Sequence, residues 1–220
     1  MEIKIAVSTN KNFYKLSLPI LLESLYLCGI NKKDIIIFNT GFESNLVENI
    51  DGVQHRFLKQ NSFEYSPLID IVENNLISDY WFLIHDTCRV GYNFKKLLYN
   101  IPSTLPNKIS LKDTPSMSIG SYKFEYLNSV KEKLLSIKNE DFSTESLKKW
   151  KIWGVPNEDF ILWKTEPKPI IYNNNPKWDI VGYENWYNTK TIRRTEYYHS
   201  LDLYKNKSNW GQSYNMTINL

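Results

Sequence analysis

Residues 80 to 85 read Tyr-Trp-Phe-Leu-Ile-His, and this apolar run ends abruptly in Asp86 and Thr87. A short run without polar alternation is typical of a strand that is covered on both faces of its sheet. Sheets of that kind belong to layered α/β domains. The run therefore predicts a central strand that brings the Asp86 carboxylate to a sheet edge, where we expect it to meet solvent and ligand.

The rest of the chain alternates between strand and helix patterns. We expect further strands at 3–8, 34–39, 53–58 and 116–120, and helices that begin near Ser17, Ser66, Asn93, Gly120, Thr144 and Asn157. This order predicts an α/β fold with a mostly parallel central sheet flanked by helices. Beyond Pro167, prolines, asparagines and aromatic residues replace the helical periodicity, and one or two strands are expected over 192–204.

Length and charge limit the classes of function. The 220 residues fit one domain, and a net charge of +3 is too small for a dedicated nucleic-acid binder but suits an anionic ligand such as a nucleotide diphosphate. No apolar run is long enough to predict a transmembrane segment. The first residues do not resemble a secretory signal, and two scattered cysteines, Cys28 and Cys88, favour a reducing, cytoplasmic setting.

Ligands of open α/β sheets bind outside the carboxyl ends of the strands. That rule directs attention to Ser8, Thr9 and Asn10 after the first strand and to Asp86 and Thr87 after the central one. The simpler interpretation is that these residues cap turns, and for Asp86 the two interpretations weigh about equally.

The order of these features resembles the GT-A type of glycosyltransferase, in the nucleotide-diphospho-sugar transferase superfamily. Lys4 to Ser8 resembles the opening strand of that family, 35–39 its second strand, and 80–87 the setting of its Asp-x-Asp motif. The motif here is degenerate, because His85, Thr87 and Cys88 surround Asp86 where a second acid would stand. The resemblance covers 1–165 and implies a single Rossmann-like GT-A domain over 1–220. Its core would be 1–165, and 166–220 an irregular C-terminal extension closing over the site.

The resemblance also implies roles for residues further along the chain. Gly120, Ser121 and Tyr122 would form a small-residue turn at the acceptor site, with Trp153 in an aromatic loop nearby. Glu158 or Asp159 would be the base that deprotonates the acceptor hydroxyl, which implies an inverting reaction. A plain turn and a dipole-stabilised helix start are the alternative explanations.

The C-terminal extension offers groups for a diphosphate. The resemblance implies that a closing segment with Arg193, Arg194, His199 and residues 205–210 contacts the donor. It also implies a Mn²⁺ or Mg²⁺ site at Asp86, with His85 and His199 as further metal ligands.

The resulting expectation is a glycosyltransferase of hexosyltransferase type. It would move a sugar from a UDP- or GDP-linked donor to a hydroxyl on a glycan, protein or lipid. One alternative is a non-catalytic sugar- or nucleotide-binding member of the same fold, which the missing second acid favours. Another is a sugar-phosphate nucleotidyltransferase, although no glycine-rich loop follows the first strand.

Overall fold

The computed structural model describes residues 1–100, 108–110, 119–141, 143, 145–146, 170–171, 179–182 and 192–208, with 108–110, 170–171, 179–182, 192–194 and 207–208 described by their backbone. The strands are β1 (Ile3–Asn10), β2 (Ile35–Thr40), β3 (Leu46–Ile50), β4 (Val53–Leu58), β5 (Tyr80–His85), β6 (Cys88–Val90), β7 (Lys108–Ser110), β8 (Gly120–Lys123), β9 (Ile170–Ile171), β10 (Asp179–Gly182), β11 (Ile192–Tyr198) and β12 (Leu203–Ser208). The helices are α1 (Tyr14–Leu27), α2 (Tyr65–Glu73), α3 (Phe94–Tyr99), α4 (Phe124–Ser129) and α5 (Lys131–Ser136), with 3₁₀ turns η1 (Lys32–Asp34) and η3 (His199–Leu201).

The main sheet has the strand order β3-β4-β2-β1-β5-β8-β7-β9. Its four central strands, β4, β2, β1 and β5, run parallel. β3 is antiparallel to β4, and β8 is antiparallel to both β5 and β7. The expected α/β class is therefore confirmed, and the sheet is parallel in its centre and partly antiparallel towards its edges.

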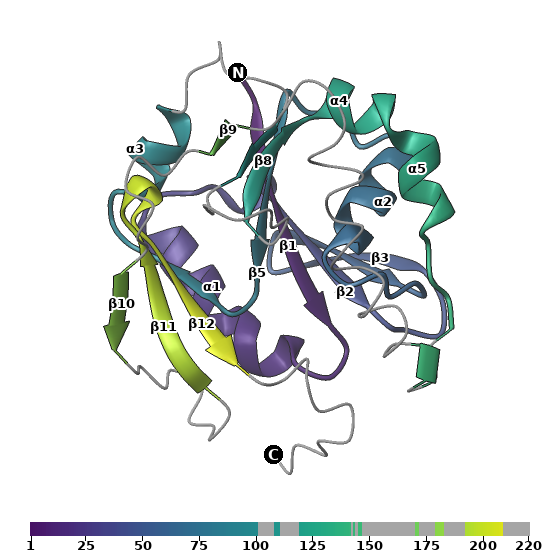
Figure 1. The fold of residues 1–220 in the computed structure, drawn as a ribbon, viewed down its shortest axis with the longest axis horizontal. Coiled ribbons are helices and arrows are strands. Elements are labelled where there is room, and N and C mark those ends of the chain that lie inside the picture. The colour runs from purple at the N-terminus through teal and green to yellow at the C-terminus, as the bar shows by residue number, and fades with distance from the viewer. Residues whose placement is uncertain are drawn as a thin grey trace.

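Both faces of this sheet are covered, as the apolar run of β5 predicts. Figure 1 shows α1 and α3 on one side of the sheet and α2, α4 and α5 on the other. Alternate residues of β5 enter the two resulting cores: Phe82 and Ile84 pack on the α1 side, whereas Trp81 and Leu83 pack on the α2 side. β5 is thus a central strand buried on both faces.

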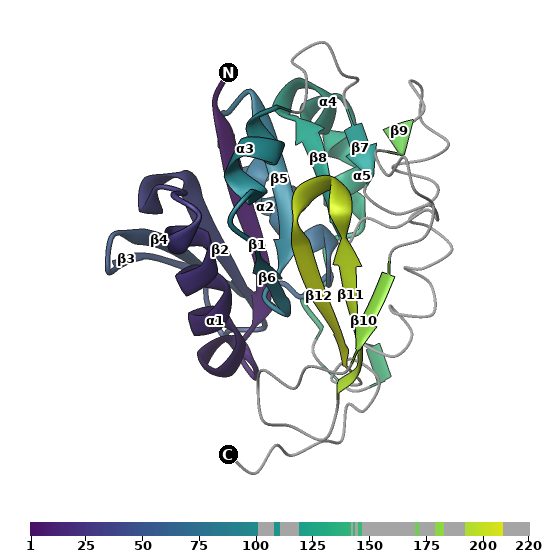
Figure 2. The same cartoon turned by 90° about the vertical axis from the view of Figure 1, so that its left-hand side faces the viewer.

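A second, antiparallel sheet lies on the α1 side, with the order β10-β11-β12-β6 (Figure 2). β6 follows β5 directly, so this sheet joins the C-terminal strands to the centre of the fold. The expectation of strands over 192–204 is confirmed by β11 and β12. The expectation of an irregular C-terminal extension is wrong for this described part, because backbone pairing organises it into a sheet.

Several local expectations also change. α1 begins at Tyr14, so Ser17 lies inside the helix and does not cap it. The strand expected at 116–120 shares only Gly120 with β8, which continues to Lys123 where the helix was expected to begin, and 116–118 lie outside the described residues. The helix expected up to Ile137 is interrupted at Val130, where α4 ends and α5 begins.

Candidate functional site

The strand order places a topological switch point between β1 and β5. The chain lays β2 and β4 on one side of β1 and then returns to place β5 on the other side. In parallel pairing, Ser8 is level with His85 and Thr9 is level with Asn39, so the carboxyl ends of three strands meet at one edge. Such a switch point is where open α/β sheets bind ligands.

Asp86 lies at this point, directly after β5. Its backbone N–H donates to the Ser8 carbonyl oxygen at 3.1 Å. Its side-chain Oδ2 accepts hydrogen bonds from the hydroxyls of Thr9 and Ser17, each at 2.5 Å. The predicted position at the carboxyl end of the central strand is confirmed, but the residue is only 6% exposed and so does not reach an open rim.

The burial of Asp86 governs its protonation. Desolvation raises the pKa of this carboxyl, because the charged form loses its hydration. The Ser17 and Thr9 hydroxyls, the Thr87 backbone N–H and the Lys205 ammonium all lower the pKa again, but less strongly. Asp86 is therefore an internal carboxyl supported by several donors.

The C-terminal strands supply the cover over Asp86. The backbone N–H of Asn206 in β12 donates to the Thr87 carbonyl oxygen at 3.0 Å, and Lys205 is level with Cys88 of β6. Lys205 is 6% exposed, and Glu196, which lies opposite it on β11, is 1% exposed. Sequence reasoning singled out the stretch that contains Lys205 but missed Glu196 and Ser17, since no local pattern marks either.

An open pocket of about 440 Å³ lies at the same end of the parallel strands, on the β2 and β4 side of β1. That volume is in the usual range for small-molecule sites. Its lining residues come from the loops after β1 and β2 and from β3 and β4: Lys11, Phe42, Glu43, Ser44, Leu46, Glu48 and Phe57. The pocket therefore opens close to the same sheet edge as Thr9.

Aromatic rings form the wall of this pocket. The Phe42 and Phe57 rings meet edge to face, with centroids 4.9 Å apart, and the Tyr14 ring contacts both. Gly41, directly before Phe42, has a φ of +84°, which lies in the region that favours glycine. The backbone N–H of Lys11 donates to the Thr40 carbonyl oxygen at 3.0 Å, which holds this lysine near the rings. The flat apolar rings suit a planar ligand, and the pocket offers charges of both signs, an ammonium from Lys11 and carboxylates from Glu43 and Glu48.

The predicted acceptor residues have a different environment from the one expected. Gly120, Ser121 and Tyr122 are not a turn but form strand β8, where they are level with Leu83, Phe82 and Trp81 of β5. All three are buried. Trp153, Glu158 and Asp159 lie outside the described residues.

The three predicted metal ligands are not brought together. His85 and Asp86 are consecutive residues at the end of a strand, where successive side chains point to opposite faces. His199 is exposed in the η3 turn, where its ring packs against Tyr197 at 4.5 Å. Among the described residues, no group of three His, Cys, Asp or Glu side chains is arranged to hold a metal ion. The described residues therefore do not fit the expected metal site.

Arg193 and Arg194 lie in β11, of which the structure describes only the backbone at these positions.

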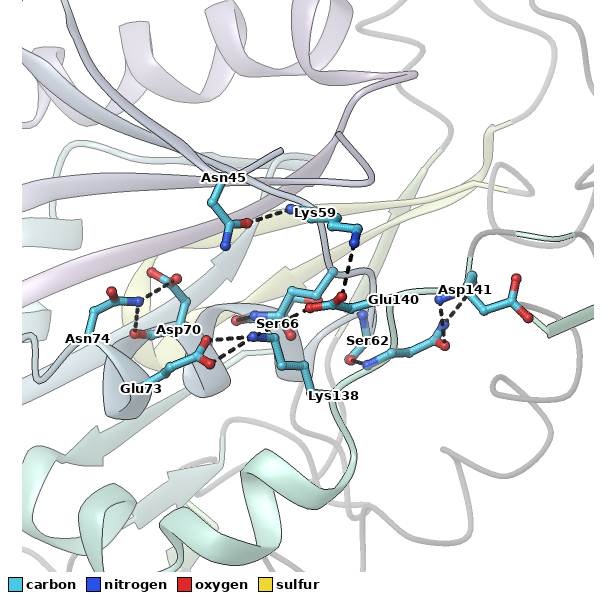
Figure 3. A network of polar contacts seen from close by, with 12 residues as sticks. Asn45, Lys59, Ser62, Ser66, Asp70, Glu73, Asn74, Lys138, Glu140 and Asp141 are labelled. Atoms are coloured by element: carbon cyan, nitrogen blue, oxygen red, sulfur yellow. Dashed lines mark hydrogen bonds and ion pairs between the residues drawn. The ribbon is translucent and has the colours of Figure 1, made fainter. Parts of the chain in front are cut away.

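A polar network fixes the segment that follows α5 to the end of β4 (Figure 3). The Ser62 hydroxyl donates to the Ile137 carbonyl oxygen at 3.0 Å and accepts from the Asn139 backbone N–H at 2.8 Å. Ion pairs of Lys59 with Glu140 and of Lys138 with Glu73 flank these bonds. The network holds 137–141 near the carboxyl end of β4, shortly before the stretch in which the base is expected.

Comparison with known proteins adds no assignment, since no protein-family model and no curated protein match this chain. Within the described part, no helix has the length and apolar character needed to cross a membrane.

Proposed function

We propose that this chain transfers a sugar from a nucleotide-diphosphate donor to a hydroxyl acceptor, with the donor bound across the carboxyl ends of β1, β2 and β5. The observation that carries the proposal is the switch point between β1 and β5. Buried polar side chains converge there from separate strands, next to an aromatic pocket with a lysine. This is the position at which the fold class binds nucleotides.

The aromatic pocket suits the nucleoside of such a donor. Phe42 and Phe57 offer ring faces and edges for a base, and Lys11 offers an ammonium group to a phosphate. The chemistry would also need a base for the acceptor hydroxyl. Glu158 and Asp159 remain the sequence-based candidates for that role, and an inverting outcome follows if either acts in this way.

Calorimetric titration with UDP-, GDP- and CMP-linked sugars, with and without Mn²⁺, tests the donor class. We expect one class to bind, and we expect Lys11→Met to weaken its binding about tenfold through loss of a charge-assisted contact. Lys33→Met is the matched control, because Lys33 is an exposed lysine just before β2, at the opposite end of the parallel strands. If no nucleotide sugar binds under any of these conditions, the proposal fails.

A non-catalytic binding protein is the second candidate, and the burial of Asp86 favours it because the predicted catalytic edge lacks that open carboxylate. The two candidates differ in turnover. Release of nucleoside diphosphate in the presence of hydroxyl acceptors supports transfer, whereas saturable donor binding without release supports the binding protein.

A further inference from the structure

The β11–β12 hairpin meets the rest of the fold at two separate places. At its turn, the Asp202 carbonyl oxygen accepts from the Gly91 backbone N–H at 2.7 Å, and its carboxylate accepts from the Asn93 N–H at 2.9 Å. A side chain at position 91 would collide with Asp202, so the close approach requires glycine. The second place is the buried polar cluster around Asp86, where β12 pairs with β6.

Lys205 is the unusual member of this cluster. Lysine is almost never fully buried unless its charge is paired, yet this one is 6% exposed. Glu196 lies directly opposite it across the antiparallel pair. The Lys205 ammonium also acts on Asp86, whose pKa it lowers. Two buried acids therefore lie around one buried ammonium.

Asp86 has little capacity left for a divalent cation. Thr9 and Ser17 both bind its Oδ2, and the Thr87 backbone N–H is a further donor. A carboxylate offers about four acceptor positions in all. These three donors use most of those positions, and a divalent cation at the remaining one would be repelled by the nearby ammonium.

We propose that Asp86 is a positioning residue that seats the β11–β12 hairpin over the switch point, with Lys205 rather than a divalent cation as its counter-charge. Thr9 and Ser17 orient the carboxyl from β1 and α1, and β12 brings the ammonium from the far end of the chain. The hairpin thereby forms a fixed wall beside the carboxyl ends of β1 and β5. The statement that this wall borders a nucleotide donor rests on the proposed function. The seating of the hairpin by Asp86 and Lys205 does not depend on it.

Hydrogen exchange on the full chain tests the seating. We expect Asp86→Asn and Lys205→Met each to speed amide exchange in residues 203–206 by about tenfold or more, because each leaves a buried partner unpaired. The double variant should lose no more protection than the worse single variant, since both remove the same interaction. Asp34→Asn, at a partly exposed acid in η1, is the matched control and should change nothing there. Unchanged protection of β12 in Asp86→Asn, or fully additive losses, would overturn the proposal.

A milder variant covers the case in which Asp86→Asn does not fold. Ser17→Ala removes a single donor to Oδ2, so we expect a smaller increase in exchange confined to the same segment. An increase spread evenly over the whole chain would count against the proposal.

Titration with MnCl₂ alone tests whether Lys205 or a divalent cation is the counter-charge of Asp86. We expect no saturable Mn²⁺ binding that depends on Asp86, so wild type and Asp86→Asn should give the same isotherm. Mn²⁺ binding that is present in wild type and lost in the variant would overturn the proposal. Donor binding in EDTA should stay within about threefold of that in Mn²⁺. If no donor binds at all, the proposed function fails, while the exchange and MnCl₂ results still decide this inference.

Discussion

At the residue scale, two consecutive residues of β4 show how burial selects the charge state of a side chain. His55 faces the α1 side of the sheet and stacks on the Phe57 ring, with centroids 6.0 Å apart. Arg56 faces the other side, where its Nε donates to the Asp70 carboxylate of α2. Both residues are buried. The imidazole can lose its charge at neutral pH, but the guanidinium cannot, and only the second therefore requires a buried counter-ion.

Arg56→Met should be strongly destabilising. It leaves the Asp70 carboxylate buried, with a hydrogen bond from the Asn74 amide but without its guanidinium partner, and we expect the free energy of unfolding to fall by roughly 3–5 kcal/mol. Burial already raises the pKa of Asp70, and the Arg56 guanidinium opposes that rise. The loss should therefore be smaller in acid, where Asp70 can be protonated.

Urea denaturation at pH 8 and pH 5 measures this effect. The exposed pair Lys59–Glu140 provides the control, because both side chains are nearly half exposed. Lys59→Met should change the stability by no more than about 1 kcal/mol. Equal losses for the two variants would contradict the argument from burial.

His55 should make the protein less stable in acid. Burial lowers the pKa of this imidazole, although the charges of Glu48 and Asp51 partly oppose the shift. A lowered pKa means that the folded state binds the proton less tightly than the unfolded state. The stability contribution is thus present above the unfolded-state pKa and is lost as the pH falls through the folded-state pKa.

Comparing wild type with His55→Gln between pH 7.5 and pH 5 isolates this contribution. The His55→Gln variant should be less stable than wild type at pH 7.5, but its stability should fall less between pH 7.5 and pH 5. Parallel pH profiles for the two proteins would show that His55 does not titrate differently in the two states.

The position of Asp86 could be predicted from the sequence, but its surroundings could not. The apolar run before Asp86 is a local signal and identified the strand end correctly. The environment depends on Thr9, Ser17 and Lys205, which are distant in the chain and are brought together by packing. A buried polar cluster of this kind leaves no spacing pattern in the sequence.

At the element scale, the long strands and helices were predictable and the short ones were not. β1, β2, β4 and β5 match the strands expected at 3–8, 34–39, 53–58 and 80–85 to within two residues at each end. β3 was not predicted because all five of its residues are exposed. It therefore has no buried face and depends on pairing with β4. β6 has only three residues, too few for a periodic signal.

The Ser62 hydroxyl is a central member of the network that connects the segment after α5 to the end of β4. Ser62→Ala removes the bonds to Ile137 and Asn139, and we expect a cost of about 1–3 kcal/mol, since a buried backbone group loses its partner. The hydrogen-exchange rate of the Asn139 amide should also rise in this variant. Ser136→Ala, which removes only a bond within exposed α5, is the control and should stay within about 0.5 kcal/mol of wild type. A larger effect for Ser136→Ala would contradict this account.

At the scale of the whole molecule, one sheet is shared by two apolar cores. The core on the α1 side includes Leu21, and the core on the α2 side includes Leu68. Layering of this kind could be predicted from the alternation of strands and helices, because a covered sheet needs helices on both faces. The second sheet could not, because its junction with the rest of the fold is the pairing of β6 with β12 across a long separation in sequence.

Because the sheet is common to both cores, the described fold should unfold as one unit. Leu21→Ala and Leu68→Ala are each expected to cost about 2–5 kcal/mol, and both should shift a single transition. Their effects should add, since they lie on opposite faces. Fluorescence and far-UV circular dichroism, followed together during urea denaturation, check this. Midpoints that separate in one variant would show that the two faces unfold independently.

The pairing of β6 with β12 also sets an order of events during synthesis on the ribosome. Val90 is level with Leu203, and both belong to the α1-side core. When β6 leaves the ribosome, its partner strand has not yet been made, so Val90 and Phe94 lack the cover that β12 and η3 later provide. The nascent chain must therefore carry an incomplete apolar face through the synthesis of the whole intervening stretch. The final packing of β6 cannot precede translation of β12.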